Sequence, residues 1–161
     1  MEVRPYRDQD QVATRQVFER AVRLTASRDY SDDQIEAWAP SGLGDGEMIA
    51  WAEARTKART IVAVERGEVI GFGDLVGSSL LDMLYVEPSA GRRGVATALF
   101  EEILRLAQAC GAEVLDTEAS ITARPFFERH GFVVVRHQTP TVRGVAMTNF
   151  RMRRPLTRGP V

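Results

Sequence analysis

The sequence predicts an α/β protein built on a central mixed β-sheet with helices on both faces. Short apolar segments rich in strand-forming residues alternate with longer segments whose apolar residues recur at helical spacing. The chain has 161 residues, 44% of them apolar, which is enough for one domain with a full core. We expect residues 1–154 to form this single domain and residues 155–161 to be a flexible tail.

The first third of the chain should supply one strand and three helices. A strand is expected at residues 2–6, followed by a helix that Asp8 or Asp10 caps and that runs to about Leu24. Ser31 should cap a short helix that Pro40 stops, and a third helix should span residues 48–57.

The middle of the chain predicts a strand meander and a crossover. Residues 60–65 and 69–75 read as a hairpin around Arg66-Gly67, and residues 80–86 read as the next, central strand. The apolar positions of residues 95–110 share one helical face, with Cys110 as a buried residue at its end. This helix should cross over to a parallel strand at residues 113–117.

The last third predicts one more helix and a closing pair of strands. The helix should start at Ser120 or Thr122 and end at His130-Gly131. Residues 132–136 and 143–152 should then form an antiparallel pair.

The loop between the central strand and the long helix is typical of an anion site. It reads Gly91-Arg92-Arg93-Gly94-Val95-Ala96. Amides at a helix N-terminus lack partners within the helix and point outward, and Gly94 lets a ligand approach the backbone. Arg92 and Arg93 add positive charge, so we expect a phosphate or pyrophosphate there.

Three phosphate-binding loops compete for this stretch. The chain has no Gly-Lys-Ser/Thr, which excludes a P-loop. A dinucleotide fingerprint needs a third glycine beside Gly91 and Gly94, although Glu118 lies near the position of its ribose-binding acid. The third candidate, [Gln/Arg]-x-x-Gly-x-[Gly/Ala], matches from its second position onward, with Gly91 in place of the first residue.

That third signature belongs to the GCN5-related N-acetyltransferases (GNAT), which the chain resembles most closely over residues 60–132. The strand ending Tyr85-Val86-x-Pro88 and the block Ala123-x-x-Phe126-Phe127-Glu128-Arg129-x-Gly131-Phe132 resemble the same family. The pattern Tyr30-Ser31-x-x-Gln34-x-x-x-Trp38-Ala39-Pro40 is similar to a bacterial, YafP-like subgroup.

The resemblance implies the GNAT fold and acetyl-CoA as the co-substrate, with no metal. Amides from Arg92 to Thr97 would hold the pyrophosphate, and backbone groups of Leu84 and Val86 would bind pantetheine between two diverging strands. The cofactor-binding residues implied in this way are Leu84, Tyr85, Val86, Arg92, Arg93, Gly94, Val95, Ala96, Thr97, Thr122, Phe126 and Phe127.

Acetyl transfer to an amine needs a base, an oxyanion donor and a fate for the thiolate. Asp82 is the first candidate base, because strand alternation places it with Leu84 and Val86 on one face, where burial would raise its pKa. The alternative is a solvated aspartate at the sheet edge. Tyr30 is the second candidate base, and Glu118 could act through water.

The backbone N–H of Leu84 or Tyr85 is the expected oxyanion donor. Phe127 stands where the family often has the tyrosine that protonates the leaving sulfur, so Tyr85 could substitute as the acid. A thiol of pKa about 8.5 can also leave unaided.

Composition limits the partners. The net charge of −1 argues against nucleic acid and anionic membranes, and a single cysteine fits the reducing cytoplasm. The acceptor should be an amine of a small molecule or protein, and assembly as a homodimer is left open. The rival function is a non-catalytic acyl-CoA-binding module, and a nucleotide-dependent oxidoreductase is a distant third.

Overall fold

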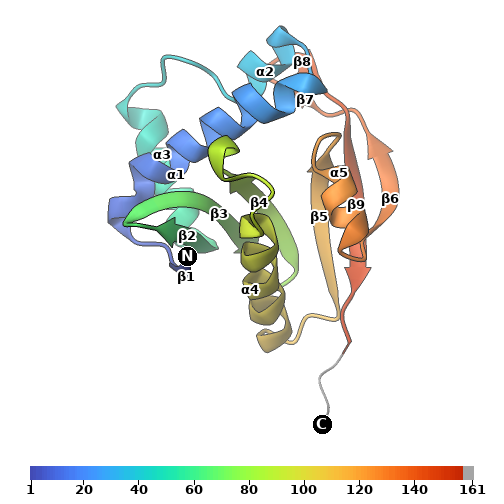
Figure 1. Cartoon of the computed structure of the whole chain (residues 1–161). Coiled ribbons are helices and arrows are strands. Elements are labelled where there is room, and N and C mark those ends of the chain that lie inside the picture. Colours follow the sequence, from blue (N-terminus) through green and yellow to red (C-terminus); the bar gives the residue numbers. More distant parts are fainter. Residues whose placement is uncertain (158–161) are drawn as a thin grey trace.

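The fold is a seven-stranded mixed sheet with helices on both faces, as the sequence predicts (Figure 1). The computed structural model describes residues 1–157. In spatial order the strands are β1 (Glu2–Pro5), β2 (Arg59–Glu65), β3 (Glu68–Val76), β4 (Leu80–Val86), β5 (Val114–Ser120), β9 (Asn149–Pro155) and β6 (Val133–Gln138). A separate hairpin joins β7 (Thr141–Val142) and β8 (Val145–Ala146).

The helices divide between the two faces of the sheet. They are α1 (Gln11–Arg20), α2 (Asp32–Trp38), α3 (Asp45–Lys57), α4 (Val95–Ala109) and α5 (Arg124–Arg129), with single turns at Asp8–Asp10, Ala26–Arg28 and Pro88–Ala90. Figure 1 shows α4 and α5 in front of the sheet. Within residues 1–157 no helix is long and apolar enough to cross a membrane.

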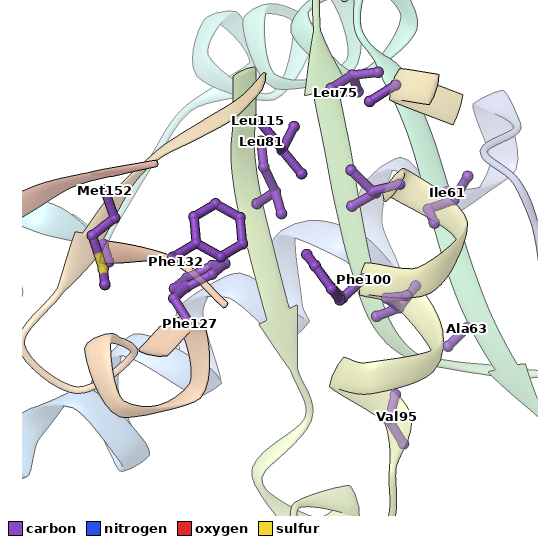
Figure 2. Close-up of a cluster of buried hydrophobic side chains, with 14 of the residues drawn as sticks. Ile61, Ala63, Leu75, Leu81, Val95, Phe100, Leu115, Phe127, Phe132 and Met152 are labelled. Atoms are coloured by element: carbon purple, nitrogen blue, oxygen red, sulfur yellow. The ribbon is translucent and has the colours of Figure 1, made fainter. Parts of the chain in front are cut away.

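Each face of the sheet has its own core. Side chains of α4 and α5 pack on apolar residues of β2 to β5 and β9, and Figure 2 shows Phe127 and Phe132 on the α5 side with Phe100 and Val95 on the α4 side. The opposite face carries a second core of residues from α1 to α3, in which Tyr85 and other aromatic rings are grouped. Helices on both faces therefore clamp β4 in the middle of the sheet.

Several predicted elements are confirmed with their boundaries. The β2–β3 hairpin turns at Arg66-Gly67, whose φ angles of 53° and 81° are those of a two-residue hairpin turn. The central strand spans residues 80–86 as expected. Ser31 caps α2, accepting from the Gln34 amide while the Gln34 side chain accepts from the Ser31 amide.

Other boundaries differ from the prediction. The first helix does not continue regularly to Leu24, because residues 21–25 form a π-helical turn. Helix α5 begins only at Arg124, and part of residues 143–148 forms β8 rather than the last strand. Cys110 is exposed instead of buried, since it caps the C-terminus of α4.

The final strand extends past the expected start of the tail. Pro155 belongs to β9, and the Leu156 amide donates a 2.9 Å hydrogen bond to the Glu113 carbonyl. Residues 158–161 of the expected tail lie outside the described residues.

Strands β4 and β5 are parallel neighbours that separate almost at once. They pair only at Leu80 with Asp116 and at Leu81 with Thr117. The Thr117 hydroxyl closes this short contact by donating to the Leu81 carbonyl at 2.9 Å. Beyond it, and within the part of the chain that the structure describes, the C-terminal part of β4 has a strand partner on its β3 side alone.

A β-bulge lies where the two strands separate. Leu81 pairs with Leu75 and Met83 pairs with Asp74, so Asp82 is the extra residue. The Asp74 carboxylate accepts the Met83 amide at 3.0 Å and thereby bonds a backbone group within the bulge. Asp74 is 0% exposed and pairs with Arg55, 4% exposed, at 3.1 Å between Nε and Oδ2.

Burial dominates the titration of Asp74. Its pKa is raised from 3.8 to about 6, first by burial and against the lowering effect of Arg55, with the Asp82 charge raising it further. The folded protein thus binds this proton more tightly than the unfolded chain does.

The first prediction concerns pH and stability. The stabilisation from the raised pKa of Asp74 is fully present below about pH 4 and is lost as pH rises through about 6. Asp74→Asn keeps an oxygen for the Met83 amide but has no such titration. Between pH 4 and pH 7 the unfolding free energy of the wild type should therefore fall relative to the variant by about 2 kcal/mol.

Urea unfolding at several pH values measures this difference. Asp116→Asn is the matched control with the opposite sign, because hydrogen bonds from Arg153 lower the pKa of Asp116 and its stabilisation is lost as pH falls. Parallel pH profiles of wild type and Asp74→Asn would contradict the assignment.

Candidate functional site

A cavity of about 540 Å³ lies on the open side of β4. One wall is β4 at Leu84 to Val86, and the opposite wall is the end of β5 with the start of α5. Residues that follow α1 cover it, and the loop before α4 lies at one end. The divergence of two parallel strands has therefore produced a hollow next to a helix N-terminus.

The backbone of β4 offers polar groups to this cavity. The amides of Met83 and Glu87 point toward β3, since they donate to the Asp74 carboxylate and the Ile70 carbonyl. Successive amides of a strand alternate in direction, so those of Leu84 and Val86 point into the gap. Of the two expected oxyanion donors, this geometry favours Leu84 over Tyr85, whose amide points to β3.

The loop before α4 has the backbone of an anion cradle. Gly94 is the N-cap of α4 with φ of 80°, and Arg92 also has a positive φ, 60°. The amides of Val95, Ala96 and Thr97 have no partner inside the helix, because such bonds begin with Ala98 donating to Gly94. A Cβ on Gly94 would meet nothing within 4 Å, so the space above the cradle is open.

The two loop arginines have different surroundings. Arg92 lines the cavity. Arg93 pairs with Glu65 at 2.6 Å and is not among the lining residues. Of the two loop arginines, only Arg92 thus contributes its charge directly to the cavity.

The π-helical turn at residues 21–25 is the part of the site that the sequence did not reveal. Leu24 is 65% exposed and lines the cavity together with Ala21 and Thr25. π-Helical turns inside helices occur frequently at functional sites. Their sequence carries no marker of its own here, since the apolar spacing reads as an ordinary helix.

Asp82 is not where the sequence placed it. It is exposed and does not line the cavity, so the alternative of a solvated aspartate is confirmed and the burial that would have raised its pKa is absent. The bulge is the reason, because the extra residue breaks strand alternation and separates Asp82 from the face of Leu84 and Val86. The charge of Asp82 still acts on two neighbouring residues, since it contributes to raising the pKa of Tyr85 and of Asp74.

Tyr30 is buried and fully hydrogen-bonded. Its hydroxyl donates to the Thr148 carbonyl and accepts from the Ile121 amide at 2.9 Å. Burial raises its pKa. These contacts tie the segment before α2 to the far half of the sheet and favour a structural role over that of a base.

Tyr85 and Glu118 have contrasting positions. Tyr85 lines the cavity, and burial raises the pKa of its hydroxyl far above neutral pH, which makes it a proton donor rather than a base. Glu118 is exposed on β5, outside the cavity lining, with Arg151 3.6 Å away.

The predicted residues near α5 do line the cavity. Thr122, Phe126 and Phe127 are all on its wall. The Thr122 hydroxyl donates to the Asp29 carboxylate at 2.8 Å and thereby joins the segment before α5 to the residues after α1. Phe127 is 4% exposed and packs on Phe132 with ring centroids 5.1 Å apart.

His130 connects α5 to the cradle. Its Nδ1 lies 2.8 Å from the Phe126 carbonyl, which can only accept, so Nδ1 carries the proton. In the neutral ring Nε2 can then accept from the Thr97 hydroxyl, 3.4 Å away. The imidazole also stacks on Phe126 at 4.1 Å between centroids, and so it joins the cavity wall to the start of α4.

Comparisons with known proteins agree on one family. The model of the acetyltransferase (GNAT) domain matches residues 26–154. The chain is 38% identical over 153 residues, 95% of each chain, to the N-acetyltransferase YafP of Escherichia coli strain K12.

Solved structures give the same result. A GCN5-related N-acetyltransferase from Rhodopseudomonas palustris superposes with a TM-score of 0.91 at 32% identity, covering 96% of this chain and 95% of the other. The acetyltransferase yncA of Salmonella typhimurium, solved with acetyl-CoA, has a TM-score of 0.71 at 20% identity and shares the fold, covering 100% of this chain and 96% of the other.

The second prediction separates two tyrosines. Tyr30→Phe leaves the Ile121 amide and the Thr148 carbonyl without their partner and should cost about 1–3 kcal/mol of unfolding free energy. Tyr6→Phe is the control, because the buried Tyr6 hydroxyl has no hydrogen-bond partner among residues 1–157, and it should cost close to nothing. Urea unfolding of both variants measures the difference, and equal losses would contradict the structural role of Tyr30.

Proposed function

Because this chain belongs to the GNAT family and is an acetyltransferase, we propose that it binds acetyl-CoA in the cavity beside β4 and transfers the acetyl group directly to an amine in one ternary complex. The observation that carries the proposal is the junction of two features. A helix N-terminus with an open glycine cradle lies at one end of a gap into which the β4 amides point. Phosphates and amides follow one another along coenzyme A in the same way.

The proposed binding mode assigns each part of the co-substrate to a neighbouring surface. The amides of Val95, Ala96 and Thr97 would hold the pyrophosphate, with Arg92 supplying charge. The exposed backbone of Leu84 and Val86 would bond the pantetheine amides as an added strand would. Thr122, Phe126 and Phe127 would form the opposite wall. Arg93 would act at longer range, because its guanidinium is paired with Glu65.

In the proposed reaction the amine nitrogen attacks the thioester carbonyl carbon, the C–S bond breaks and the thiolate leaves. The Leu84 amide would stabilise the oxyanion. Tyr85, whose raised pKa keeps it protonated, would donate a hydrogen bond or the proton to the sulfur. Phe127 cannot, since it has no hydroxyl.

The attacking amine must also lose a proton. We propose that Asp82 accepts it through water, since its exposed carboxylate lies at the bulge and raises the pKa of the Tyr85 hydroxyl. Tyr30 is the less favoured base because both sides of its hydroxyl are bonded, and Glu118 is less favoured because Arg151 lies beside it.

Family membership favours this enzyme over the alternative of a non-catalytic acyl-CoA-binding module. The acceptor is an amine, of a small molecule or a protein. The cytoplasm as its compartment and a homodimer as its assembly stay predictions.

The third prediction tests the cradle. Acetyl-CoA at 100 times its dissociation constant should stabilise the fold by about 2.7 kcal/mol, and NAD should do much less. Gly94→Val forces a branched residue to φ of 80°, which costs about 1–2 kcal/mol, and projects it into the phosphate space. The variant should stay folded but lose the acetyl-CoA shift in thermal unfolding.

Gly77→Val is the matched control. Gly77 has φ of 62°, equally open space around a Cβ and a place in the β3–β4 turn, outside the cavity lining. The Gly77→Val variant should lose the same stability from backbone strain and keep the thermal shift with acetyl-CoA. Equal loss of the thermal shift in both variants would contradict the assignment of the loop at Gly94 to the pyrophosphate.

The fourth prediction tests Asp82. Asp82→Asn should leave acetyl-CoA affinity unchanged and lower turnover by roughly 10²- to 10⁴-fold at pH 7. The deficit should shrink as pH approaches the pKa of the amine, because unprotonated amine then forms without help. Thiol release across a pH series measures both, with Glu118→Gln as the control at an exposed carboxylate that does not line the cavity. Near-normal turnover of Asp82→Asn would remove Asp82 from the mechanism.

A further inference from the structure

We propose that the amine acceptor of this enzyme carries an aryl group, which packs against Trp38 and Tyr85, and has no second cationic group. The inference rests on the proposed function, in that it takes the acceptor to enter the cavity beside β4.

The two rings form a wall of the cavity. Trp38 is the last residue of α2 and Tyr85 lies on β4, and both are half-buried and line the cavity. Their centroids are 6.4 Å apart and their planes meet at 63°. A flat, apolar group can contact both, since aromatic rings favour such edge-to-face geometry.

Further rings hold this wall in place. Phe18 packs edge-on against Tyr85 at 5.0 Å, and Phe72 lies 5.8 Å from it. Tyr30, fixed by its own hydrogen bonds, packs edge-on against Trp38 at 5.3 Å. An aryl ligand would therefore meet surfaces that are already positioned, which lowers the entropic cost of binding.

The wall lies on the side opposite to the expected co-substrate contacts. Trp38 and Tyr85 pack with the core on the α1–α3 face of the sheet, whereas the side chains of Leu84 and Val86 pack on the α4 face. If pantetheine follows the backbone edge of β4, the two rings remain available to the other substrate. The acceptor would then approach from the α1–α3 side.

The charges of the lining exclude a polycation. Among residues 1–157, three charged residues line the cavity: Arg28, Glu87 and Arg92. Glu87 already accepts two hydrogen bonds from Arg20, at 2.8 and 2.9 Å. A polyamine or an aminosugar with several ammonium groups would face the Arg28 guanidinium, since Arg92 is assigned to the pyrophosphate, and would find no unpaired carboxylate among the described residues of this wall.

Calorimetry with the CoA-loaded protein tests the inference independently of turnover. The probes are 2-phenylethylamine, n-propylamine, which lacks the ring, and spermidine, which adds cations. The wild type should bind 2-phenylethylamine at least about tenfold more tightly than either of the others, because only that probe buries a ring.

Two variants locate the effect. Trp38→Leu should weaken the binding of 2-phenylethylamine by about 3- to 10-fold, which corresponds to the loss of one aromatic pair. The affinity for n-propylamine should stay unchanged. Trp38→Phe, which restores a ring, should recover most of the loss, and an unchanged CoA-induced thermal shift in both variants checks their fold.

Equal binding of 2-phenylethylamine and n-propylamine, tighter binding of spermidine, no binding of any probe, or no response to Trp38→Leu would each overturn the inference. An assay of thiol release from acetyl-CoA tests the proposed acetyl transfer separately. Selective binding of 2-phenylethylamine without thiol release supports the aryl site and contradicts the transferase. Thiol release at equal rates with all three amines contradicts the aryl site alone.

Discussion

The structure depends on one buried carboxylate. The Asp74 carboxylate accepts a hydrogen bond from the Met83 amide at the point where β4 carries an extra residue. Arg55 forms an ion pair with the same carboxylate. An unpaired amide at a buried bulge would cost free energy, so the side chain of Asp74 allows the ladder to be interrupted here. The interruption lies next to the last β4–β5 pair, Leu81 with Thr117, and beyond it the strands separate and the cavity opens. The cavity beside β4 therefore depends on the buried carboxylate of Asp74.

Separated strands need another connection, and side chains before and within α2 supply it. Tyr30 bonds to Thr148 and Ile121, while Asp29 bonds to Thr122. On the far side, Arg143 donates to the Ala37 carbonyl at 2.7 Å. Together with the core under α4, these contacts span the gap that the sheet leaves open. They also position Trp38, so the same segment that joins the two halves presents an aromatic surface to the cavity.

The electrostatics of the site follow from a few pairings. Arg93 and Glu87 are neutralised by Glu65 and Arg20, which leaves Arg28, Arg92 and the α4 N-terminus as the attraction for an anion. Burial keeps the Tyr85 hydroxyl protonated. One end of the cavity is therefore suited to phosphates, and the inner end is apolar and aromatic with a proton donor beside it.

The sequence by itself determined the order of the main elements and the backbone geometry of the loop before α4. Local patterns carry both: apolar periodicity identifies α4, and Gly94 marks a positive φ that a side chain would resist. The backbone role of Leu84 and Val86 came from family resemblance, and strand alternation supports it. The tertiary structure alone decided the environment of Asp82, because a bulge depends on Asp74 in the neighbouring strand and alternation cannot reveal it. It also decided that Tyr30 is bonded on both sides and that residues 21–25 turn as a π-helix against the cavity. These features arise from contacts between segments distant in the chain, which no local pattern records.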